Sequence, residues 1–540
     1  MISGTREISE TSFDVIVIGA GINGAGIARD AAMRGLSVLL LDKGDLGGAT
    51  SSWSTRLIHG GLRYLEHGEL RLVRESLRER ETLLHIAPHL VKPLPMLIPI
   101  YAGNQRGPLT IRAGMIAYDL LSWKKTLPRH HMLSRSRVLH EAPALNPEGL
   151  RGAAVYFDAQ VEFPERLVVE NALSAERHGA AVVTHAKVEK LKVIDGVVEE
   201  TECRDMLEGR SFSVRGRLVV NAAGPWVDQV LSTSEETSQH LIGGTKGSHL
   251  IVAPFAGAPE TALYVEAESD GRPFFIIPWD GKYLIGTTDI RFAGDLDRLE
   301  ITEVEIDYLL REANRVIPGA NLISESILFT YSGVRPLPFT REEDAPSITR
   351  RHFIQSHPRF KNLISIVGGK LTIYRSLSEA TVDLIFRKLG RNPPDCRTAE
   401  EALSGRVTAD RRPDQRHIDQ QLSPSTRERL LRIYGARSGS ILTLIREDAS
   451  LASVFDSETG AIAAEVVYAF KHELARTLAD CLLRRTMVGL NSTMGIGADI
   501  AAAKIAQEYL GWSEDRARSE VESYRNYVER FRRGLEGLVS

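Results

Sequence analysis

The hydrophobic pattern at the start of the chain predicts two buried strands joined by a helix. An apolar run at residues 15–18 leads into a glycine-rich turn, and a helix of small residues follows over about residues 25–33. Gly35 ends that helix, and a second apolar run occupies residues 37–41. A strand, a glycine turn, a helix and a parallel strand form a βαβ unit, whose strands are buried on both faces.

The glycine-rich turn matches the G-x-G-x-x-G pattern of dinucleotide-binding proteins. Gly19, Gly21 and Gly24 supply the glycines, with Asn23 between them. They let the backbone turn tightly and approach a pyrophosphate that sits on the helix N-terminus. Asp42 ends the second strand, where a carboxylate can bind both ribose hydroxyls. The pattern does not separate FAD from NAD, and a glycine turn in an ordinary βαβ unit is the structural alternative.

A loop rich in glycine and hydroxyl groups follows the second strand. It offers backbone donors and hydroxyls with little bulk, which suits close contact with a flat cofactor and its phosphates. A flexible surface loop is the alternative, but His, Arg and Tyr so close to a glycine pair favour a functional role. The residues of interest are Thr50, Ser51, Ser52, His59, Gly60, Gly61, Arg63 and Tyr64.

The pattern changes further along the chain. Between residues 242 and 290, alternating or apolar runs with turn residues between them predict antiparallel strands, a substrate-binding sheet inserted into the nucleotide fold. Residues 90–101 contain prolines and predict an extended or edge strand. An apolar run and glycine turn at residues 363–371, followed by a helical pattern at 372–389, close the nucleotide domain.

The last part of the chain has a helical pattern. Residues 391–417 are rich in Arg, Asp and Pro, have little periodicity, and predict a linker. The sequence therefore predicts a nucleotide-binding domain at residues 1–390 and a helical domain at 418–540. The inserted cap would comprise about residues 80–150 and 240–335.

Composition narrows the class of protein. The 540 residues carry a formal net charge of −3, which argues against a nucleic-acid protein dominated by phosphate contacts. Cys203, Cys396 and Cys481 are widely scattered, so we expect a reducing compartment and no metal site. The polar N-terminus lacks the apolar core of a signal peptide, and no run is long enough to span a membrane. We expect a protein that is soluble or rests on a membrane surface.

One segment has the character of a membrane-surface helix. Residues 111–125 are apolar, include Trp123 and end in two lysines, and Arg129 and His130 follow. An amphipathic segment with Trp and a basic flank can lie in a membrane interface. A core helix with a basic end is the alternative, and the sequence alone favours it slightly. The tryptophan and lysines still motivate a prediction of peripheral membrane attachment through this segment.

Several cations stand on glycine turns. Arg63 follows Gly60 and Gly61, Arg335 follows Gly333, and Lys370 follows a glycine pair. Cations converging on one cofactor face would suit an anionic substrate, whereas a surface charge or salt bridge is the alternative for any one of them. His249 and His59 could serve as a base near neutral pH, and a satisfied core histidine is an equally good interpretation of each.

At this level of detail the chain resembles the FAD-dependent glycerol-3-phosphate dehydrogenases, from about residue 13 to residue 389 and on into the helical domain. The resemblance implies an α/β fold, with a Rossmann-like FAD-binding domain, an inserted antiparallel substrate-binding sheet and a C-terminal α-helical domain. This family is in turn similar to the wider glycine/D-amino-acid oxidase fold group. The runs that carry it are IHGGLRYL at 58–65, NAAGPWV at 221–227, KGSHLIV at 246–252, GVRPL at 333–337 and GGKLT at 368–372.

The resemblance also implies an activity and roles for residues. The family oxidises sn-glycerol 3-phosphate to dihydroxyacetone phosphate by hydride transfer from C2 to FAD N5. Electrons then pass to a quinone, or to oxygen in oxidase members. The implied cofactor-binding residues are Gly19, Gly21, Asn23, Gly24, Asp42, Thr50, Ser51, Ser52, His59, Gly60, Gly61, Val188, Gly224, Gly369, Lys370 and Thr372. The implied catalytic and substrate-binding residues are Arg63, Tyr64, His249, Thr288, Arg335, Arg350 and Lys370, with His249 or Lys370 helping to remove the hydroxyl proton.

The implied partners are the substrate and a quinone as electron acceptor. With the segment at 111–125, we expect a cytoplasmic protein that associates peripherally with the cytoplasmic membrane; a homodimer is left open. Two features depart from the family pattern: Arg56 stands where many members have Lys, and residues 162–167 replace the usual Asp-Asp-x-Arg-Leu. The departure at 162–167 puts any polar contact made there in doubt. Two other functions stay open: an amine or amino-acid oxidase of the same fold, and a non-catalytic FAD-binding module that docks on a membrane.

Overall fold

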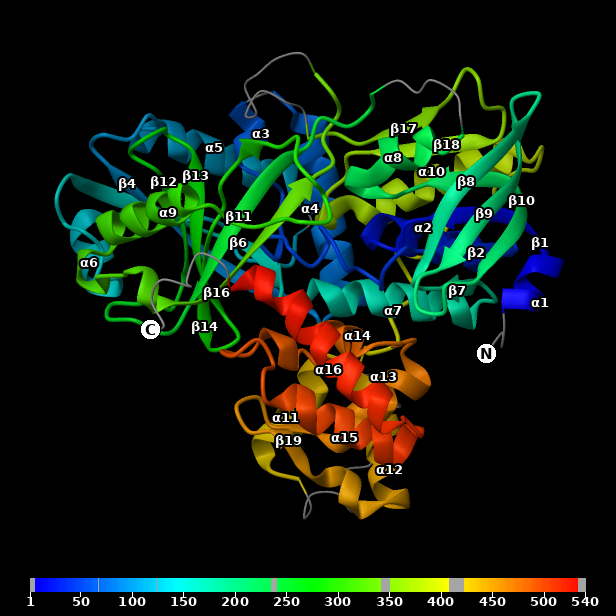
Figure 1. The fold of residues 1–540 in the computed structure, drawn as a ribbon. Helices are drawn as coiled ribbons and strands as arrows, with labels where there is room; N and C mark the ends of the chain where they lie inside the picture. The colour runs from blue at the N-terminus through cyan, green and yellow to red at the C-terminus, as the bar shows by residue number, and fades with distance from the viewer. Residues whose placement is uncertain are drawn as a thin grey trace.

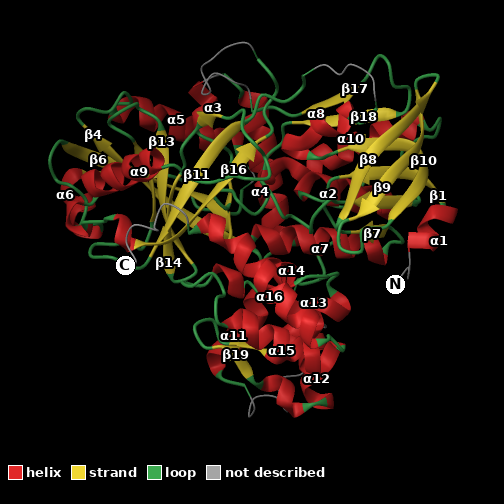
Figure 2. Ribbon diagram, in the orientation of Figure 1, coloured by secondary structure: helices red, strands yellow, loops and turns green. Residues whose placement is uncertain are grey.

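The computed structural model describes residues 5–66, 68–123, 125–234, 240–340, 350–406 and 422–532. Two β-sheets with covering helices lie side by side, and a helical domain lies below both (Figure 1). Colouring by secondary structure shows that this lower domain is helical apart from one short hairpin (Figure 2). The predicted α/β fold class with a C-terminal helical domain is confirmed.

The first sheet holds the glycine fingerprint. Its strand order is β17-β18-β10-β1-β2-β7, and the pairs β18–β10, β10–β1, β1–β2 and β2–β7 are parallel. Helix α2 packs against α7 and α10, so the central strands are covered and fully buried. The strands and helices of this layer are β1 (Ser12–Ile18), β2 (Val38–Leu41), β7 (Ala181–Val183), β10 (Ser211–Asn221), β17 (Phe353–Ser356), β18 (Leu363–Val367), α2 (Ile22–Met33), α7 (Pro164–Arg177), α8 (Val227–Ser232) and α10 (Tyr374–Lys388).

A hairpin of two long strands, β8 (Ala186–Ile194) and β9 (Val197–Asp205), extends strand β10 in antiparallel fashion. The short helix α1 (Thr5–Glu10) precedes β1. The predicted polar N-terminus thus continues directly into the first strand; residues 1–4 lie outside the described part of the chain.

The second sheet is almost entirely antiparallel. Its main path runs β15-β11-β14-β13-β12-β4-β6-β3, with β16 paired to β11 and β5 paired to β6. Helix α9 (Glu303–Val316) packs on it and begins with a capping box, in which Thr302 and Glu305 each accept a hydrogen bond from the other's backbone N–H. The strands are β3 (Leu57–Ile58), β4 (Val91–Tyr101), β5 (His131–Ser134), β6 (Leu150–Val161), β11 (Thr245–Val252), β12 (Ala262–Glu266), β13 (Pro273–Trp279), β14 (Lys282–Gly286), β15 (Ile290–Arg291) and β16 (Ile327–Arg335), and the other helices near them are α3 (Arg63–Glu66), α4 (Leu70–Ile86), α5 (Pro108–Leu121) and α6 (Arg135–Glu141).

Strand β4 corrects one expectation. Its prolines suggested an edge strand, yet β4 lies between β6 and β12 inside the sheet. It pairs with β6 along its whole length, but its pairing with β12 covers only Met96 and Leu97. Pro93, Pro95 and Pro99 all lie outside that short pairing, so their missing N–H groups leave the contact with β12 intact.

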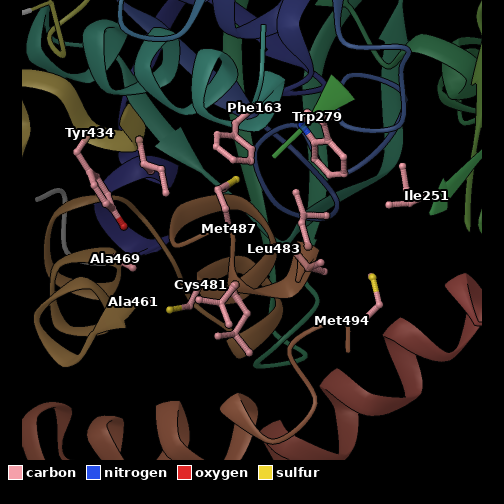
Figure 3. Close-up of a cluster of buried hydrophobic side chains, with 14 of the residues drawn as sticks. Phe163, Ile251, Trp279, Tyr434, Ala461, Ala469, Cys481, Leu483, Met487 and Met494 are labelled. Atoms are coloured by element: carbon pink, nitrogen blue, oxygen red, sulfur yellow. The ribbon is translucent and has the colours of Figure 1, made fainter. Parts of the chain in front are cut away.

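The C-terminal domain packs its helices around one core and docks on both sheets. Figure 3 shows Phe163 and Trp279 of the N-terminal part beside Tyr434, Leu483 and Met487 of the helical domain, all members of one buried cluster. Because this core is continuous across the boundary, the two parts are joined by packed side chains. The elements are α11 (Pro424–Tyr434), α12 (Ser438–Glu447), β19 (Val454–Asp456), β20 (Ala461–Ile462), α13 (Ala463–His472), α14 (Leu478–Asp480), the π-helical turn η9 (Cys481–Arg485), α15 (Ala498–Leu510), α16 (Glu514–Val528) and η11 (Glu529–Phe531).

The predicted linker is only partly described. Residues 391–406 run along the N-terminal domain, where Leu403 is buried and its N–H donates to the Ile86 carbonyl. Residues 407–417 of that prediction lie outside the described residues. Across the described ranges, none of the helices combines the length and hydropathy needed to cross a membrane.

Candidate active site

Most of the residues singled out in the sequence line one large cavity. It has a volume of about 1460 Å³, above the roughly 300–1,000 Å³ of an ordinary small-molecule site, so it has room for a dinucleotide and a small substrate together. The predicted residues on its wall are Gly19, Gly21, Asn23, Asp42, Thr50, Ser51, His59, Gly61, Arg63, Tyr64, Val188, Gly224, His249, Arg335, Arg350, Gly369, Lys370 and Thr372.

Four predicted residues, Gly24, Ser52, Gly60 and Thr288, do not line the cavity and lie behind its wall. The Cα of Gly24 faces strand β1, where an added Cβ would be 1.8 Å from the Gly19 carbonyl oxygen. The Ser52 hydroxyl donates to the Gly47 carbonyl at 2.6 Å, and the Gly60 N–H donates to the Tyr118 hydroxyl at 2.8 Å. These three residues therefore shape the turn and loop from behind.

Thr288 is the fourth. Its hydroxyl donates to the Glu305 carboxylate at 2.7 Å and accepts from the Ser248 N–H at 2.9 Å, so it is buried beneath the cavity. Successive residues of an extended chain point to opposite sides. Its neighbours Thr287 and Asp289 are accordingly the ones on the cavity wall.

The end of the cavity near α2 has the features of a dinucleotide cradle. Gly19 has φ +102°, which favours glycine, and leaves no space for a side chain beside the Ala222 carbonyl. The Asp42 carboxylate accepts from the Ala20 N–H at 2.6 Å and the Gly44 N–H at 2.8 Å. Burial raises the pKa of Asp42 despite these two hydrogen bonds.

The first turn of α2 also faces the cavity. The Ser51 hydroxyl accepts from the Ile22 N–H at 3.0 Å, so the hydroxyl loop is held against the positive end of the helix. Near this end of the cavity, the buried atoms Asn23 Oδ1 and Trp226 Nε1 have no hydrogen-bond partner within the described ranges. Buried polar groups are normally hydrogen-bonded, and a bound dinucleotide would satisfy such atoms. The residues present therefore fit FAD.

A second glycine turn, at residues 368–369, lies beside Asn23 of the fingerprint. Gly369 has φ +101° and lies beside Asn23, and the Thr372 hydroxyl accepts from the His59 N–H at 3.1 Å. Lys370 extends from this turn, with its Nζ 3.2 Å from Ser76 Oγ and 4.1 Å from the centre of the Tyr64 ring. Burial lowers the pKa of Lys370, although Tyr64 opposes that change.

Burial and nearby cations keep both His249 and His59 neutral. His249 Nε2 is 2.9 Å from the Thr55 hydroxyl, and its ring is 4.8 Å from the Tyr331 ring. Burial, followed by Arg335 and Arg56, lowers the pKa of His249 well below 6.5. Burial and then Lys370 lower the pKa of His59 to about 3. Both imidazoles are therefore neutral at neutral pH, and each has one unprotonated ring nitrogen that can accept a hydrogen bond.

An arginine cluster forms the anion-binding wall. Asp289 Oδ1 accepts from Arg335 Nη1 at 3.0 Å, and Asp289 Oδ2 accepts from Arg350 Nη2 at 2.6 Å. Arg335 also donates to the Thr287 hydroxyl, and Arg272 donates to the Asp289 backbone carbonyl at 2.6 Å. Burial disfavours the ionised carboxylate, but Arg335 and Arg350 outweigh it and lower the pKa of Asp289 to about 2. One carboxylate thus holds two guanidinium groups on the cavity wall, where they can receive a phosphate.

Asp289 and Arg272 were not among the residues predicted from the sequence. Asp289 follows Thr288 in a run that the sequence had placed in the inserted sheet, so a carboxylate beside a pocket candidate was the available signal. Arg272 stands between Gly271 and Pro273 and resembles an ordinary turn residue in the sequence.

The two departures from the family pattern meet in space. Arg56 and Glu165 form a bidentate pair, with both N–O distances 3.0 Å and both side chains buried. The Arg56 guanidinium also lies 4.3 Å from the centre of the Trp279 ring. Residues 162–167 therefore do make a polar contact, through Glu165 to Arg56. Arg56 lines the cavity together with His249.

Comparison with known proteins identifies the family. Residues 14–373 match the model of FAD dependent oxidoreductases, and residues 396–517 match the C-terminal domain of alpha-glycerophosphate oxidase. The chain is 46% identical to a glycerol-3-phosphate dehydrogenase of Synechocystis sp. across 97% of both chains. The chain belongs to the FAD-dependent glycerol-3-phosphate dehydrogenase family. FAD is thus confirmed as the cofactor.

Two further relatives support the same family assignment. An aerobic glycerol-3-phosphate dehydrogenase of Staphylococcus haemolyticus is 32% identical, with 89% of this chain and 88% of that one covered. The solved glycerol-3-phosphate dehydrogenase of Bacillus halodurans, complexed with FAD, superposes with a TM-score of 0.77 at 28% identity, covering 97% of this chain and 96% of that one. Within the described residues, no cluster of His, Cys, Asp or Glu is arranged to hold a metal ion.

Proposed function

We propose that this dehydrogenase oxidises sn-glycerol 3-phosphate to dihydroxyacetone phosphate. The observation that carries the proposal is the Arg335–Asp289–Arg350 cluster on the wall of the cavity that holds the glycine fingerprint. Two guanidinium forks beside one another match the several oxygens of a phosphate better than the single carboxylate of an amino acid. Bound FAD would supply the two-electron acceptor.

The chain's own residues would position the substrate and receive a proton. His249 and Lys370 lie on the same cavity wall as the arginine cluster. His249 lines the cavity and its Nδ1 has no partner in the described part of the chain, so we assign it the role of binding the C2 hydroxyl and receiving its proton. Burial lowers the pKa of Lys370, which makes it the second candidate for that role. Arg63 and Tyr64 close the same wall from helix α3.

We further propose a quinone as the electron acceptor and the cytoplasmic face of a membrane as the site of action. Helix α5 supports this, because its outer side and the turn that follows it form a stripe of exposed apolar residues: Leu109 is 82% exposed, Leu120 61% and Trp123, two residues beyond the helix, 72%. Its inner side is anchored by buried Met115 and Tyr118. In Figure 1, α5 lies on the side of the molecule opposite the C-terminal helical domain, which leaves the stripe uncovered.

The occupant proposed for this stripe is an anionic lipid surface. An exposed amphipathic helix with Trp and neighbouring cations is typical of interfacial anchors. Arg112 and Arg129 are exposed near the stripe, and the Arg129 guanidinium lies 5.9 Å from the centre of the Trp123 ring. Lys124, part of the predicted basic end, lies outside the described residues.

The test is anaerobic mixing of the purified holoenzyme with glycerol 3-phosphate, followed by stopped-flow reoxidation with a soluble quinone and, separately, with oxygen. We expect the flavin to bleach with glycerol 3-phosphate and not with amino acids, and to reoxidise faster with the quinone. Bleaching by amino acids alone would indicate an amino-acid oxidase. No bleaching by any substrate would indicate a non-catalytic FAD-binding module. Faster reoxidation by oxygen would indicate an oxidase, which is the second candidate function because the C-terminal match is to that class.

A further inference from the structure

The C-terminal helical domain forms part of the cavity wall. The Phe531 ring lies 4.6 Å from the Trp53 ring, and the Phe531 carbonyl accepts from the Thr330 hydroxyl at 3.2 Å. Figure 1 shows α16 rising from the lower domain towards β16. The C-terminal residues that line the cavity include Asp480, Arg484, Tyr527, Arg530 and Phe531.

A buried ion cluster joins this domain to the cofactor loop. The Asp45 carboxylate accepts from Arg485 Nη1 and Nη2 at 2.7 Å each and from Arg484 Nε at 2.5 Å. The side chains of Asp45 and Arg485 are fully buried, and that of Arg484 is nearly so. Both arginines belong to the π-helical turn η9, and π-helical turns often occur at functional sites.

Asp45 lies in the middle of a loop whose two ends contact the dinucleotide cradle. At one end the Asp42 carboxylate accepts from the Ala20 N–H, and at the other the Ser51 hydroxyl accepts from the Ile22 N–H. The Gly47 N–H also donates to the Ala20 carbonyl at 3.0 Å, which ties the loop to the cradle at a third point. The Asp45 cluster holds the same part of the loop from the other side, through the C-terminal domain.

The ionic character of this contact indicates that it holds the loop around Asp45 in one position. Docking by apolar residues would avoid the desolvation that a buried ion cluster requires, and buried ion pairs add little net stability compared with packed apolar side chains. The interface already has such packing, around Phe163, Trp279 and Met487. A bidentate guanidinium–carboxylate pair adds what that packing lacks, a single fixed geometry for the Asp45 backbone.

We propose that Asp45, Arg484 and Arg485 are positioning residues through which the C-terminal domain holds the cofactor loop in its FAD-binding conformation. Docking of the domain and binding of FAD then strengthen one another, because coupling between two binding events is reciprocal. The inference depends on FAD as the cofactor and is independent of the substrate proposed above.

The experiment compares FAD release from holoenzyme variants, followed by the rise in FAD fluorescence after dilution. Asp45→Asn removes the charge and should release FAD at least tenfold faster than the unmodified chain. Arg485→Lys keeps the charge but loses the fork and should give an intermediate rate. The matched control is Glu473→Gln, which breaks another buried pair between the two parts, Arg166–Glu473 at 2.6 Å, whose residues do not line the cavity.

Unfolding in urea, followed by circular dichroism, separates positioning from simple docking. The proposal is supported if Asp45→Asn and Glu473→Gln lose similar stability but only Asp45→Asn releases FAD faster. It is overturned if both release FAD equally fast, or if Asp45→Asn releases it at the unmodified rate.

A second measurement needs no variant, should Asp45→Asn fail to fold. Amide hydrogen exchange of η9 and η11 in the unmodified chain should slow by at least threefold when FAD is added to apoprotein. Exchange there that does not respond to FAD would also overturn the proposal.

Discussion

Replacement of Arg335 by alanine tests the phosphate site most directly. In the structure its guanidinium is held by Asp289 and by the Thr287 hydroxyl, with its fork on the cavity wall. Hydrogen bonds between ionised groups contribute about 1.5–3 kcal/mol each. Arg335 is partly open to solvent, and Arg350 remains after the substitution, so we expect a loss of about 3 kcal/mol. This corresponds to a decrease of roughly 100-fold in kcat/KM.

The assay is steady-state reduction of an artificial dye with glycerol 3-phosphate and, in parallel, with glycerol, which has no phosphate. Arg335→Ala should lower kcat/KM for glycerol 3-phosphate, chiefly through a higher KM, and should leave the weak turnover of glycerol unchanged. Arg335→Lys keeps the charge without the fork, so its kcat/KM for glycerol 3-phosphate should lie between those of the unmodified enzyme and Arg335→Ala.

The control is Arg298→Ala, which removes an exposed cation near the cavity but not on its wall. It should change kcat/KM less than threefold. A comparable loss in both arginine variants would show that the effect is general electrostatic steering. An equal loss with glycerol would show that Arg335 does not bind the phosphate.

Three further predictions concern the carboxylate of the arginine cluster, the buried histidines and helix α5. Asp289→Asn should raise KM for glycerol 3-phosphate about tenfold, or about 1.4 kcal/mol, because Arg335 and Arg350 lose their shared anchor; a lower KM in the same assay would show that repulsion between carboxylate and phosphate dominates instead. The pKa of His59 is lowered to about 3 by burial, so between about pH 6.5 and pH 3 the unfolded chain binds more protons than the folded one. The free energy of unfolding of the apoprotein, measured by urea titration, should therefore fall as pH drops below 6.5, and His59→Gln should reduce that fall; equal slopes would contradict it. Trp123→Glu should weaken flotation with anionic liposomes, whereas Val304→Glu, at an isolated exposed residue of α9, should not; equal flotation of both variants would reject α5 as the anchor.

The local parts of the fold could be predicted from the sequence. The fingerprint turn places Gly19 and Gly21 at a strand end and a helix start within a few residues, so chain order already fixes their geometry. The N-caps Thr302 and Ser513 are equally local, because each side chain accepts a hydrogen bond from the backbone N–H three residues further along the chain. Such features depend on neighbours in the chain and need no knowledge of tertiary contacts.

The carboxylates of the site could not be predicted in the same way. The cations stand beside glycine turns, and this position identified them as site candidates in the sequence. Asp289 instead follows two threonines on an extended segment. Its role arises because Arg335 and Arg350 reach it from positions 46 and 61 residues away in the chain. Asp45 meets Arg485 across 440 residues, and nothing in the local sequence around Arg484 and Arg485 pairs them with Asp45. Contacts of this range depend on how the domains dock, which no local pattern encodes.

The contact between Arg56 and Glu165 is also long-range, at 109 residues in the chain, and could not be predicted from the sequence. In the sequence, Arg56 and the segment 162–167 that contains Glu165 departed from the family pattern without any visible reason. In the structure they neutralise one another in a buried site, where removing one partner of an ion pair costs about 3–5 kcal/mol. A change at either position therefore requires a compatible residue at the other. The planar fork of Arg56 also stacks on Trp279, which a lysine could not reproduce with the same geometry. Arg56 and Glu165 therefore act as one unit, which lies beside His249 on the wall of the cavity.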